Sequence, residues 1–256
     1  MTPVVTGLSD SADPTPWTVA VVGLGMIGGS LVRGLARLPV PPRVLGASPC
    51  AGDREGAERQ AGVVAVADAA EVVGEADVVV YATPMHIMLD LLPVHAGCFR
   101  EDALVTDVAG LKRPVLDAAR RAGLAGRFLG SHPMAGGEAT GFDGGRPDLF
   151  RGAQVWLCAD SPLDPSRSAL LEAFWRVLGA SPEWADPDVH DRLMVRVSHL
   201  PQLVSNVLAM ALESAGVAPE DLGPGGRDMT RLAASSPSAW VDLIEHRATD
   251  AAKLLR

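Results

Sequence analysis

The sequence predicts an α/β fold, a parallel sheet with helices on both faces, followed by an all-helical domain. Up to about residue 180, short apolar runs typical of buried strands alternate with helical stretches. This alternation is typical of βαβ units, whose consecutive strands lie parallel. After about residue 185, apolar residues recur only at helical spacing, which predicts a domain boundary there.

The expected elements follow one another in a simple order. Residues 1–16 carry no Lys or Arg and no long apolar stretch, so we expect a flexible tail rather than a secretory signal. An α/β domain is expected over 17–185, and an all-helical domain over 186–256. Strands are expected at 17–22, 43–46, 77–82, 103–108, 127–130 and 154–159. Helices are expected at 28–38, 165–178, 187–212 and from Ser238 onward.

Composition narrows the classes of function. The chain has 256 residues, of which 48% are hydrophobic and 21% charged, as in ordinary globular proteins. A net charge of -9 argues against general affinity for nucleic acid or membrane, although a local cluster of arginines can still bind anionic substrates. No apolar run approaches the roughly 20 residues that span a bilayer. The cysteines, Cys50, Cys98 and Cys158, are far apart, which favours a reduced, cytoplasmic protein without a metal site.

A glycine-rich turn follows the first expected strand. Residues 23–28 match G-x-G-x-x-G and directly precede an expected helix, the setting of a dinucleotide fingerprint. Gly23 permits the tight turn, Gly25 admits a pyrophosphate and Gly28 lets the helix pack on the strand. The alternative is a glycine-rich turn without a ligand. The expected cofactor-binding residues are Gly23, Gly25, Met26, Ile27, Gly28, Ser48, Arg54, Thr83 and Pro84.

The end of the second expected strand bears on the choice between NAD and NADP. NAD-binding proteins place an acid about 20 residues after the glycines, where it binds the ribose. Here Ser48 stands at that distance, and the first acid is Asp53, next to Arg54. A carboxylate would repel a 2′-phosphate, so its absence favours NADP, with Ser48 and Arg54 near that phosphate. The alternative is that Asp53 folds back onto the ribose of NAD.

Four later segments carry the chemistry. They are 106–112 (TDVAGLK), 130–138 (GSHPMAGGE), 197–201 (VSHLP) and 226–233 (GRDMTRLA). In order and spacing they resemble the prephenate/arogenate dehydrogenase family, and the resemblance covers nearly the whole chain from about Thr18. The stretches around His132, His199 and Arg231 are specific to that family, whereas the glycine loop is not.

The resemblance implies a fold, a reaction and residue roles. It implies a Rossmann domain, followed by a helical domain that forms a homodimer. The implied reaction is oxidative decarboxylation of prephenate or arogenate in tyrosine biosynthesis, with hydride transfer to NAD(P). It yields 4-hydroxyphenylpyruvate or tyrosine. His132 would accept the proton of the ring hydroxyl, since an imidazole can do so near neutral pH. Arg231 would bind the ring carboxylate, and His199 and Glu138 would lie in the pocket.

Two departures from the family pattern concern the substrate. Gly110 stands where the family usually has a serine that bonds the substrate hydroxyl and the catalytic histidine. Gln202 stands where it often has a second histidine, and this loss of charge leans toward arogenate over prephenate. A substrate with an amine in place of the hydroxyl needs the serine less, so 4-amino-4-deoxyprephenate is an alternative substrate.

Other classes of function and structural roles stay open at this point. His132 in a turn, His199 on a helix and Arg231 on a surface would all be ordinary structural residues. An inactive NADP-binding sensor would keep the glycine loop, but would have no reason to combine His132 with Arg231. The 3-hydroxy acid dehydrogenases use a lysine on the first long helix of their second domain, and residues 187–212 contain none.

Overall fold

The computed structural model describes residues 17–59, 63–137, 139–160 and 164–235. The chain divides into two compact units, Met1–Pro187 and Asp188–Arg256. The expected tail over 1–16, the expected helix after Ser238 and the candidate pocket residue Glu138 lie outside the described residues. Within the described part, no helix is both long and apolar enough to cross a membrane.

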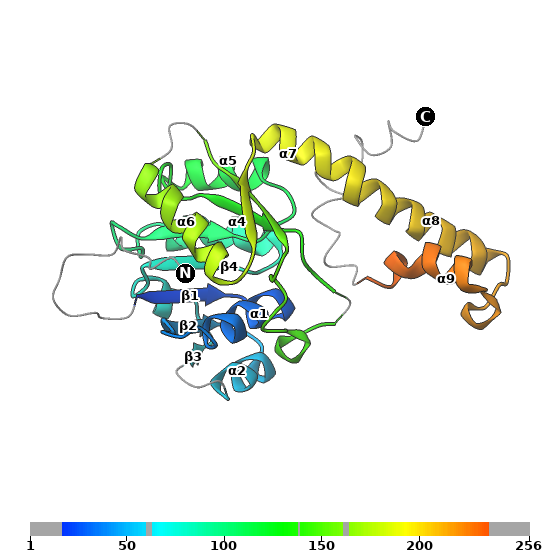
Figure 1. The fold of residues 1–256 in the computed structure, drawn as a ribbon, viewed down its shortest axis with the longest axis horizontal. Helices are drawn as coiled ribbons and strands as arrows, with labels where there is room; N and C mark the ends of the chain where they lie inside the picture. Colours follow the sequence, from blue (N-terminus) through cyan, green and yellow to red (C-terminus); the bar gives the residue numbers. More distant parts are fainter. Residues whose placement is uncertain (1–16, 60–62, 138, 161–163, 236–256) are drawn as a thin grey trace. The chain divides into compact units, whose positions relative to one another are not determined.

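A five-stranded parallel sheet forms the centre of the first unit (Figure 1). Its strands are β1 (Thr18–Val22), β2 (Arg43–Ala47), β3 (Val63–Val66), β4 (Val78–Tyr81) and β5 (Leu104–Asp107). They lie in the order β3-β2-β1-β4-β5, and every neighbouring pair is parallel. β1, β4 and β5 are buried along their whole length. β1 and β4 accordingly consist almost entirely of apolar residues, whereas β5 ends in the buried polar residues Thr106 and Asp107. The sequence did not predict β3.

Helices cover both faces of this sheet. Successive side chains of a strand point to opposite faces, so Val19 and Val21 pack in one core while Ala20 and Val22 pack in another. The first core holds residues of α1 (Met26–Leu35) and α6 (Pro165–Val177). The second holds residues of α3 (Ala70–Val73), α4 (Met85–His95) and α5 (Arg113–Arg121). α2 (Ala51–Glu58) joins β2 to β3.

The last three strands of the first unit form a separate sheet. β6 (Gly130–Pro133) pairs antiparallel with β7 (Gln154–Cys158), which pairs parallel with β8 (Ser181–Trp184). The strand expected at 127–130 is therefore wrong in its bounds. Only an isolated parallel bridge, Val105 to Phe128, forms there, because the chain leaves β5 after it and pairs with β7 instead. The sequence also did not predict β8.

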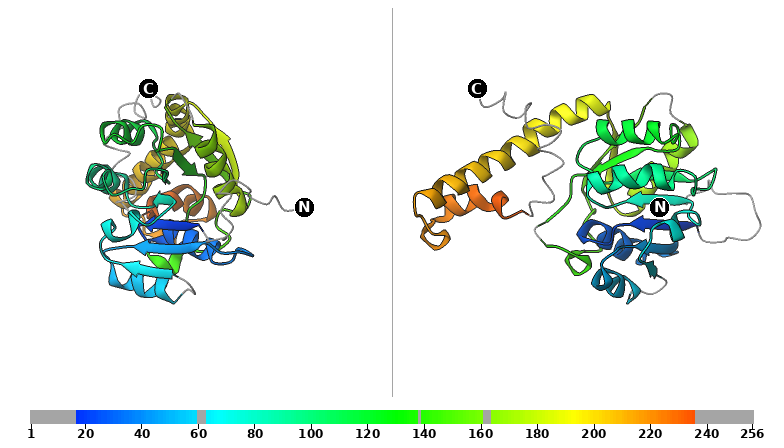
Figure 2. Two further views of the ribbon diagram at one scale, coloured as in Figure 1. Left: turned by 90° about the vertical axis from the view of Figure 1, so that its left-hand side faces the viewer. Right: turned by 180° about the vertical axis from the view of Figure 1, so that it is seen from behind.

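The second unit is helical. α7 (Pro187–Met194) continues through a π-helical turn (Val195–His199) into α8 (Leu200–Ser214), and Figure 2 shows the three as one rod, coloured yellow to gold. The π turn lies just before Pro201, which has no N–H to donate to the preceding turn. A short 3₁₀ turn η3 (Pro219–Asp221), α9 (Pro224–Thr230) and a 3₁₀ turn η4 (Arg231–Ala234) follow. Together the two units confirm the predicted fold class.

The turn between β1 and α1 depends on two glycines. Gly23 has a φ of 96°, and a Cβ there would lie 2.6 Å from the Ala82 carbonyl oxygen. A Cβ on Gly28 would lie only 1.8 Å from the Gly23 carbonyl oxygen. By contrast, a Cβ on Gly25 would meet nothing within 4 Å. The fold therefore requires glycine at positions 23 and 28 but not at position 25.

This difference predicts opposite effects of two alanine substitutions on stability. Gly28→Ala should lower the free energy of unfolding by about 3 kcal/mol or more, because the new methyl group overlaps backbone that must move. Gly25→Ala, the matched control, should change it by less than about 1 kcal/mol, because the extended backbone of this N-cap residue and the open space beside it accept the methyl group. Chemical denaturation followed by circular dichroism measures both. Equal stabilities of the two variants would contradict this description of the turn.

Candidate functional site

Three loops meet at one edge of the parallel sheet. The glycine turn follows β1, Thr83 and Pro84 follow β4, and Gly110 lies in the loop after β5. Since β1 lies between β2 and β4, the chain reverses direction along the sheet there. The crevice at such a reversal, outside the carboxyl ends of the strands, is where α/β sheets bind ligands.

The residues of this edge fit a dinucleotide. α1 begins after Gly25 with no side-chain cap and no acid in its first turn, so its N-terminal N–H groups face outward with their partial positive charge. The open space at Gly25 leaves room for a pyrophosphate to approach these groups. Thr83 adds a buried hydroxyl, Oγ1, with no hydrogen-bond partner among the described residues. Met26 and Ile27 are half-buried, whereas Pro84 is exposed as the N-cap of α4.

The end of β2 holds the residues expected to distinguish NAD from NADP. Asp53 Oδ1 accepts the N–H of Phe142 at 2.8 Å, and Asp53 Oδ2 lies 3.4 Å from Ser48 Oγ. Arg54 Nη1 donates to the carbonyl oxygens of Ser48 and Pro49, at 2.8 and 3.0 Å. Asp53 thus accepts a hydrogen bond from the backbone of Phe142. Arg54 holds its guanidinium at the end of β2.

His132 lies in β6, opposite Trp156 of β7, and is half-buried. A Cβ added to Gly110 would lie 3.8 Å from Nε2 of His132 and 4.0 Å from Cε1. Because Gly110 is exposed and carries no side chain, nothing from that residue covers this nitrogen. The structure therefore brings His132 and Gly110 close together.

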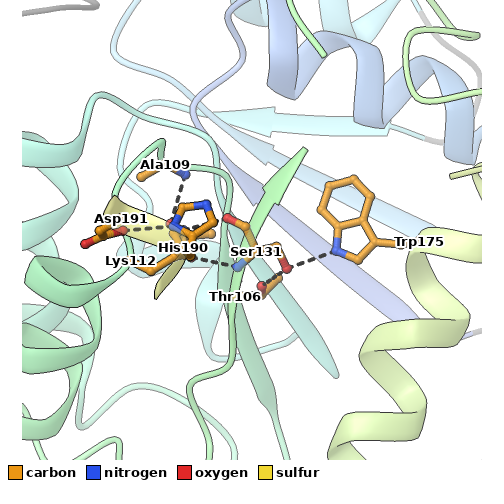
Figure 3. A network of polar contacts seen from close by, with 8 residues as sticks. Thr106, Ala109, Lys112, Ser131, Trp175, His190 and Asp191 are labelled. Carbon is orange, nitrogen blue, oxygen red and sulfur yellow. Dashed lines mark hydrogen bonds and ion pairs between the residues drawn. The ribbon is translucent and has the colours of Figure 1, made fainter. Parts of the chain in front are cut away.

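A buried polar network surrounds Ser131, the residue before His132 (Figure 3). The Ser131 N–H donates to Asp107 Oδ1 at 3.1 Å, and the Ser131 carbonyl oxygen accepts from Lys112 Nζ at 2.6 Å. Lys112 Nζ also forms an ion pair with Asp107 Oδ2. Burial raises the pKa of Asp107, and the ammonium of Lys112, which lies against the carboxylate, opposes that shift.

The side chain of Ser131 is held as well. Figure 3 shows Trp175 pointing from α6 toward Ser131, and its Nε1 donates to Ser131 Oγ at 2.9 Å. Thr106 Oγ1 lies 2.8 Å from the same oxygen. The N–H, the carbonyl oxygen and the hydroxyl of Ser131 thus all have buried partners. These partners come from β5, from the loop after β5 and from α6, and they fix the segment that carries His132.

The loop after His132 returns over the glycine turn. A Cβ on Gly137 would lie 3.4 Å from the sulfur of Met26. Further along, the ring of Phe142 is buried against Gly29 and Gly56, so it lies between α1 and α2. The guanidinium of Arg33 lies over this ring, 4.4 Å from its centroid. This contact fixes the loop that links His132 to the glycine turn.

In the helical unit, α8 holds the turn that carries Arg231. Gln202 Nε2 donates to the Leu232 carbonyl oxygen at 2.7 Å, and Ser205 Oγ accepts the Ala233 N–H at 3.1 Å. Arg231 itself is exposed, whereas His199 and Gln202 are buried. Gln202 Oε1 has no hydrogen-bond partner among the described residues. Within this unit, Gln202 therefore supports the Arg231 turn, a contact that sequence reasoning did not foresee.

Two features of the site were not predicted from the sequence. One is the contact of Phe142 with α1 and α2, and the other is the Lys112–Asp107 pair. The sequence does contain a signal for the Lys112–Asp107 pair: the chain has twenty arginines but only two lysines, Lys112 and Lys253. A lysine inside an apolar stretch of an arginine-rich chain indicates a place that favours a compact ammonium over a planar guanidinium.

Comparisons with known proteins agree over most of the chain. A model of the prephenate dehydrogenase nucleotide-binding domain matches residues 40–183, and a model of the prephenate dehydrogenase dimerization domain matches residues 186–255. The chain is 30% identical over 244 residues to prephenate dehydrogenase of Bacillus subtilis, covering 90% of this chain. It spans only 64% of that relative's length.

Solved structures point to the same family. Prephenate dehydrogenase of A. aeolicus, in complex with hydroxyphenyl propionate and NAD⁺, superposes with a TM-score of 0.84 at 28% identity, covering 93% of this chain and 85% of that one. Synechocystis arogenate dehydrogenase gives 0.77 at 30% identity, covering 93% and 86%. The resemblance inferred from the four segments is therefore confirmed: this chain belongs to the prephenate dehydrogenase family, whose nucleotide-binding domain binds a nicotinamide cofactor.

Proposed function

We propose that this protein catalyses the oxidative decarboxylation of a cyclohexadienyl acid, prephenate or arogenate, with hydride transfer to NADP. The observation that carries the proposal is the placement of His132 Nε2 beside the exposed, side-chain-free Gly110, at the edge of the sheet that fits a dinucleotide. The relatives named prephenate and arogenate dehydrogenase support the substrate class.

Each candidate residue has one task in this reaction. His132 Nε2 takes the proton of the ring hydroxyl as the carbon that bears it is oxidised. The nicotinamide, when bound, accepts the hydride from that carbon. Arg231 holds the ring carboxylate until the carboxylate leaves as carbon dioxide and the ring becomes aromatic. The glycine turn and Thr83 hold and orient the cofactor.

Replacing His132 tests the base. His132→Asn should keep cofactor affinity within about twofold, because the residue does not contribute to the glycine turn. It should lose about 10²–10⁴-fold in kcat, the usual contribution of general acid–base catalysis. Steady-state kinetics with prephenate and arogenate, each with NAD and NADP, measures this. A loss of less than fivefold at saturating substrate would move the base elsewhere, and a wild type that binds cofactor but turns over no acid would indicate a sensor.

The preference for NADP rests on the end of β2. Asp53 accepts the Phe142 N–H and lies 3.4 Å from the Ser48 hydroxyl, so these contacts compete with a hydrogen bond from the ribose of NAD. Arg54 places a guanidinium at the same strand end, which suits a 2′-phosphate.

Two substitutions test this preference. Arg54→Ala should weaken NADP binding by about 10- to 100-fold and leave NAD binding nearly unchanged, because a hydrogen bond to a charged group contributes about 1.5–3 kcal/mol. Ser48→Asp should shift preference toward NAD. Arg59→Ala, at an exposed arginine just after α2, is the matched control. A wild type that prefers NAD tenfold in steady-state kinetics would refute the proposal.

The role of Arg231 is tested through KM. Arg231→Ala should raise KM for the substrate by about 10- to 100-fold, the loss expected for one charged hydrogen-bonding group, while Kd for NADP stays unchanged. Lysine should rescue only partly, because it lacks the bidentate fork. Arg227→Ala, at an exposed arginine one helical turn earlier, is the control. An unchanged KM in Arg231→Ala would leave this residue a solvated surface arginine.

The amino analogue is a second candidate substrate. Because Gly110 puts no hydroxyl beside His132 Nε2, a family contact to a substrate hydroxyl is missing. A ring amine, as in 4-amino-4-deoxyprephenate, depends less on that contact. The same kinetic comparison, with this acid added, decides between the candidates by their kcat/KM values.

We also propose that the protein is a homodimer formed through its helical unit. Apolar side chains recur along one stripe of α7, the π turn and α8 and are exposed: Val189, Leu193, Val197, Val204, Val207 and Met210. Such a stripe is typical of a surface that a partner covers. The match to a dimerization domain favours a second copy of this chain as that partner.

Charge placed in the stripe should dissociate the dimer. Val207→Glu should convert the dimer to a monomer in sedimentation velocity at micromolar concentration, because a buried, unpaired carboxylate opposes association. Val40→Glu, at an exposed valine of the first unit, should leave it unchanged. A wild-type monomer, or a dimer that survives Val207→Glu, would contradict this assembly.

A further inference from the structure

We infer that Lys112 and Asp107 are positioning residues for His132, which they fix by holding the backbone of Ser131. The inference rests on the proposed function only in naming His132 as the base. Lys112 and Asp107 act through the neighbouring residue, and the contacts that carry the argument are those around Ser131.

The Asp107–Lys112 ion pair joins the end of β5 to the backbone of β6. Near Val105 the chain forms a single parallel bridge: Val105 N–H donates to the Arg127 carbonyl oxygen, and Leu129 N–H donates to the Val105 carbonyl oxygen, both at 2.9 Å. Two residues later, side chains take the place of the backbone partners. Asp107 accepts the Ser131 N–H, and Lys112 donates to the Ser131 carbonyl oxygen.

These contacts leave the segment little freedom. Lys112, Asp107 and Ser131 are fully buried, so neither backbone group of Ser131 can turn to water instead. A Cβ on Gly130 would lie 3.1 Å from Cδ of Lys112, which shows how closely the lysine stem passes over the β6 backbone. Lys112 and Asp107 therefore also fix the position of His132, the next residue in the chain.

The same ion pair also fixes the loop after β5. Asp107 Oδ2 accepts the Ala109 N–H at 2.9 Å, and Lys112 is the N-cap residue of α5, so their ion pair closes the loop over 108–111. Gly110 lies in that loop, facing His132 Nε2. One ion pair thus sets both sides of the space where the substrate's reacting group must fit. A displacement of about 1 Å at such a place can cost about 10²-fold in rate.

The decisive variant removes both charges. Lys112→Met alone leaves an uncompensated buried carboxylate and is expected to be unstable. Asp107→Asn/Lys112→Met removes both charges of the pair, and its asparagine oxygen can still accept the Ser131 N–H, but the Ser131 carbonyl oxygen loses its donor. We expect it to fold and bind NADP with unchanged Kd, with kcat about 10- to 100-fold lower and KM within threefold of wild type.

Two further variants separate positioning from stability. Leu171→Ala, which opens a cavity at a fully buried residue of α6, is the stability-matched control and should keep kcat within twofold. Lys112→Arg keeps the charge opposite Asp107 and so protects folding. Its planar fork cannot reproduce the ammonium contacts, and we expect about a tenfold lower kcat with unchanged KM. A kcat within twofold of wild type in Lys112→Arg, or within threefold in a folded double variant, overturns the inference.

A readout without turnover separates this inference from the proposed function. NMR of ¹⁵N-histidine-labelled protein follows the ring nitrogens of His132 through a pH titration, with His132→Asn supplying the assignment. We expect the titration curve to shift in the double variant and to match wild type in Leu171→Ala. An unchanged curve in the folded double variant overturns the positioning role. If wild type turns over none of the acids, the proposed function fails while the titration still decides this inference.

Discussion

The carboxylate of Asp107 occupies a place where a sheet would normally continue with backbone. β5 ends at this residue, and the chain that would extend the sheet leaves it to pair with β7. The Ser131 N–H would be orphaned by that departure, and a buried N–H without a partner is rare because it is costly. Asp107 and Lys112 satisfy Ser131 on both of its backbone groups. The junction between the two sheets, and with it the position of His132, depends on this contact.

The glycine turn after β1, in contrast, is determined by the shape of the backbone rather than by charge. At Gly23 and Gly28 a side chain would overlap neighbouring backbone, whereas at Gly25 it would meet open space. A glycine that the fold does not need is most simply explained by a ligand that approaches the backbone there. The loop after His132 reaches this turn through Gly137 and is fixed further on by Phe142. The segment that follows the candidate base therefore contacts the candidate phosphate site at Gly137.

Much of this arrangement could be predicted from the sequence. The buried strands β1, β4 and β5 were predicted, and the G-x-G-x-x-G spacing placed the turn correctly. β3 was missed although its residues, Val-Val-Ala-Val, form a short apolar run. β8 was missed because it includes Pro182 and Glu183 and so forms no such run. The bounds of β6 were wrong because the change of partner from β5 to β7 depends on contacts distant in sequence. Asp107 and Lys112 lay in a recognised segment, but their role appears only once Ser131 is folded against them.

The central claim is that one site couples oxidation to loss of carbon dioxide. The most direct measurement is the product stoichiometry of a single reaction run to completion, with the carboxyl group of the substrate ring carrying ¹³C. The account predicts one labelled carbon dioxide and one aromatic product for each nicotinamide reduced. Reduced cofactor without carbon dioxide would indicate a simple alcohol dehydrogenase, and carbon dioxide without reduced cofactor would indicate a decarboxylase. Either result would contradict the account.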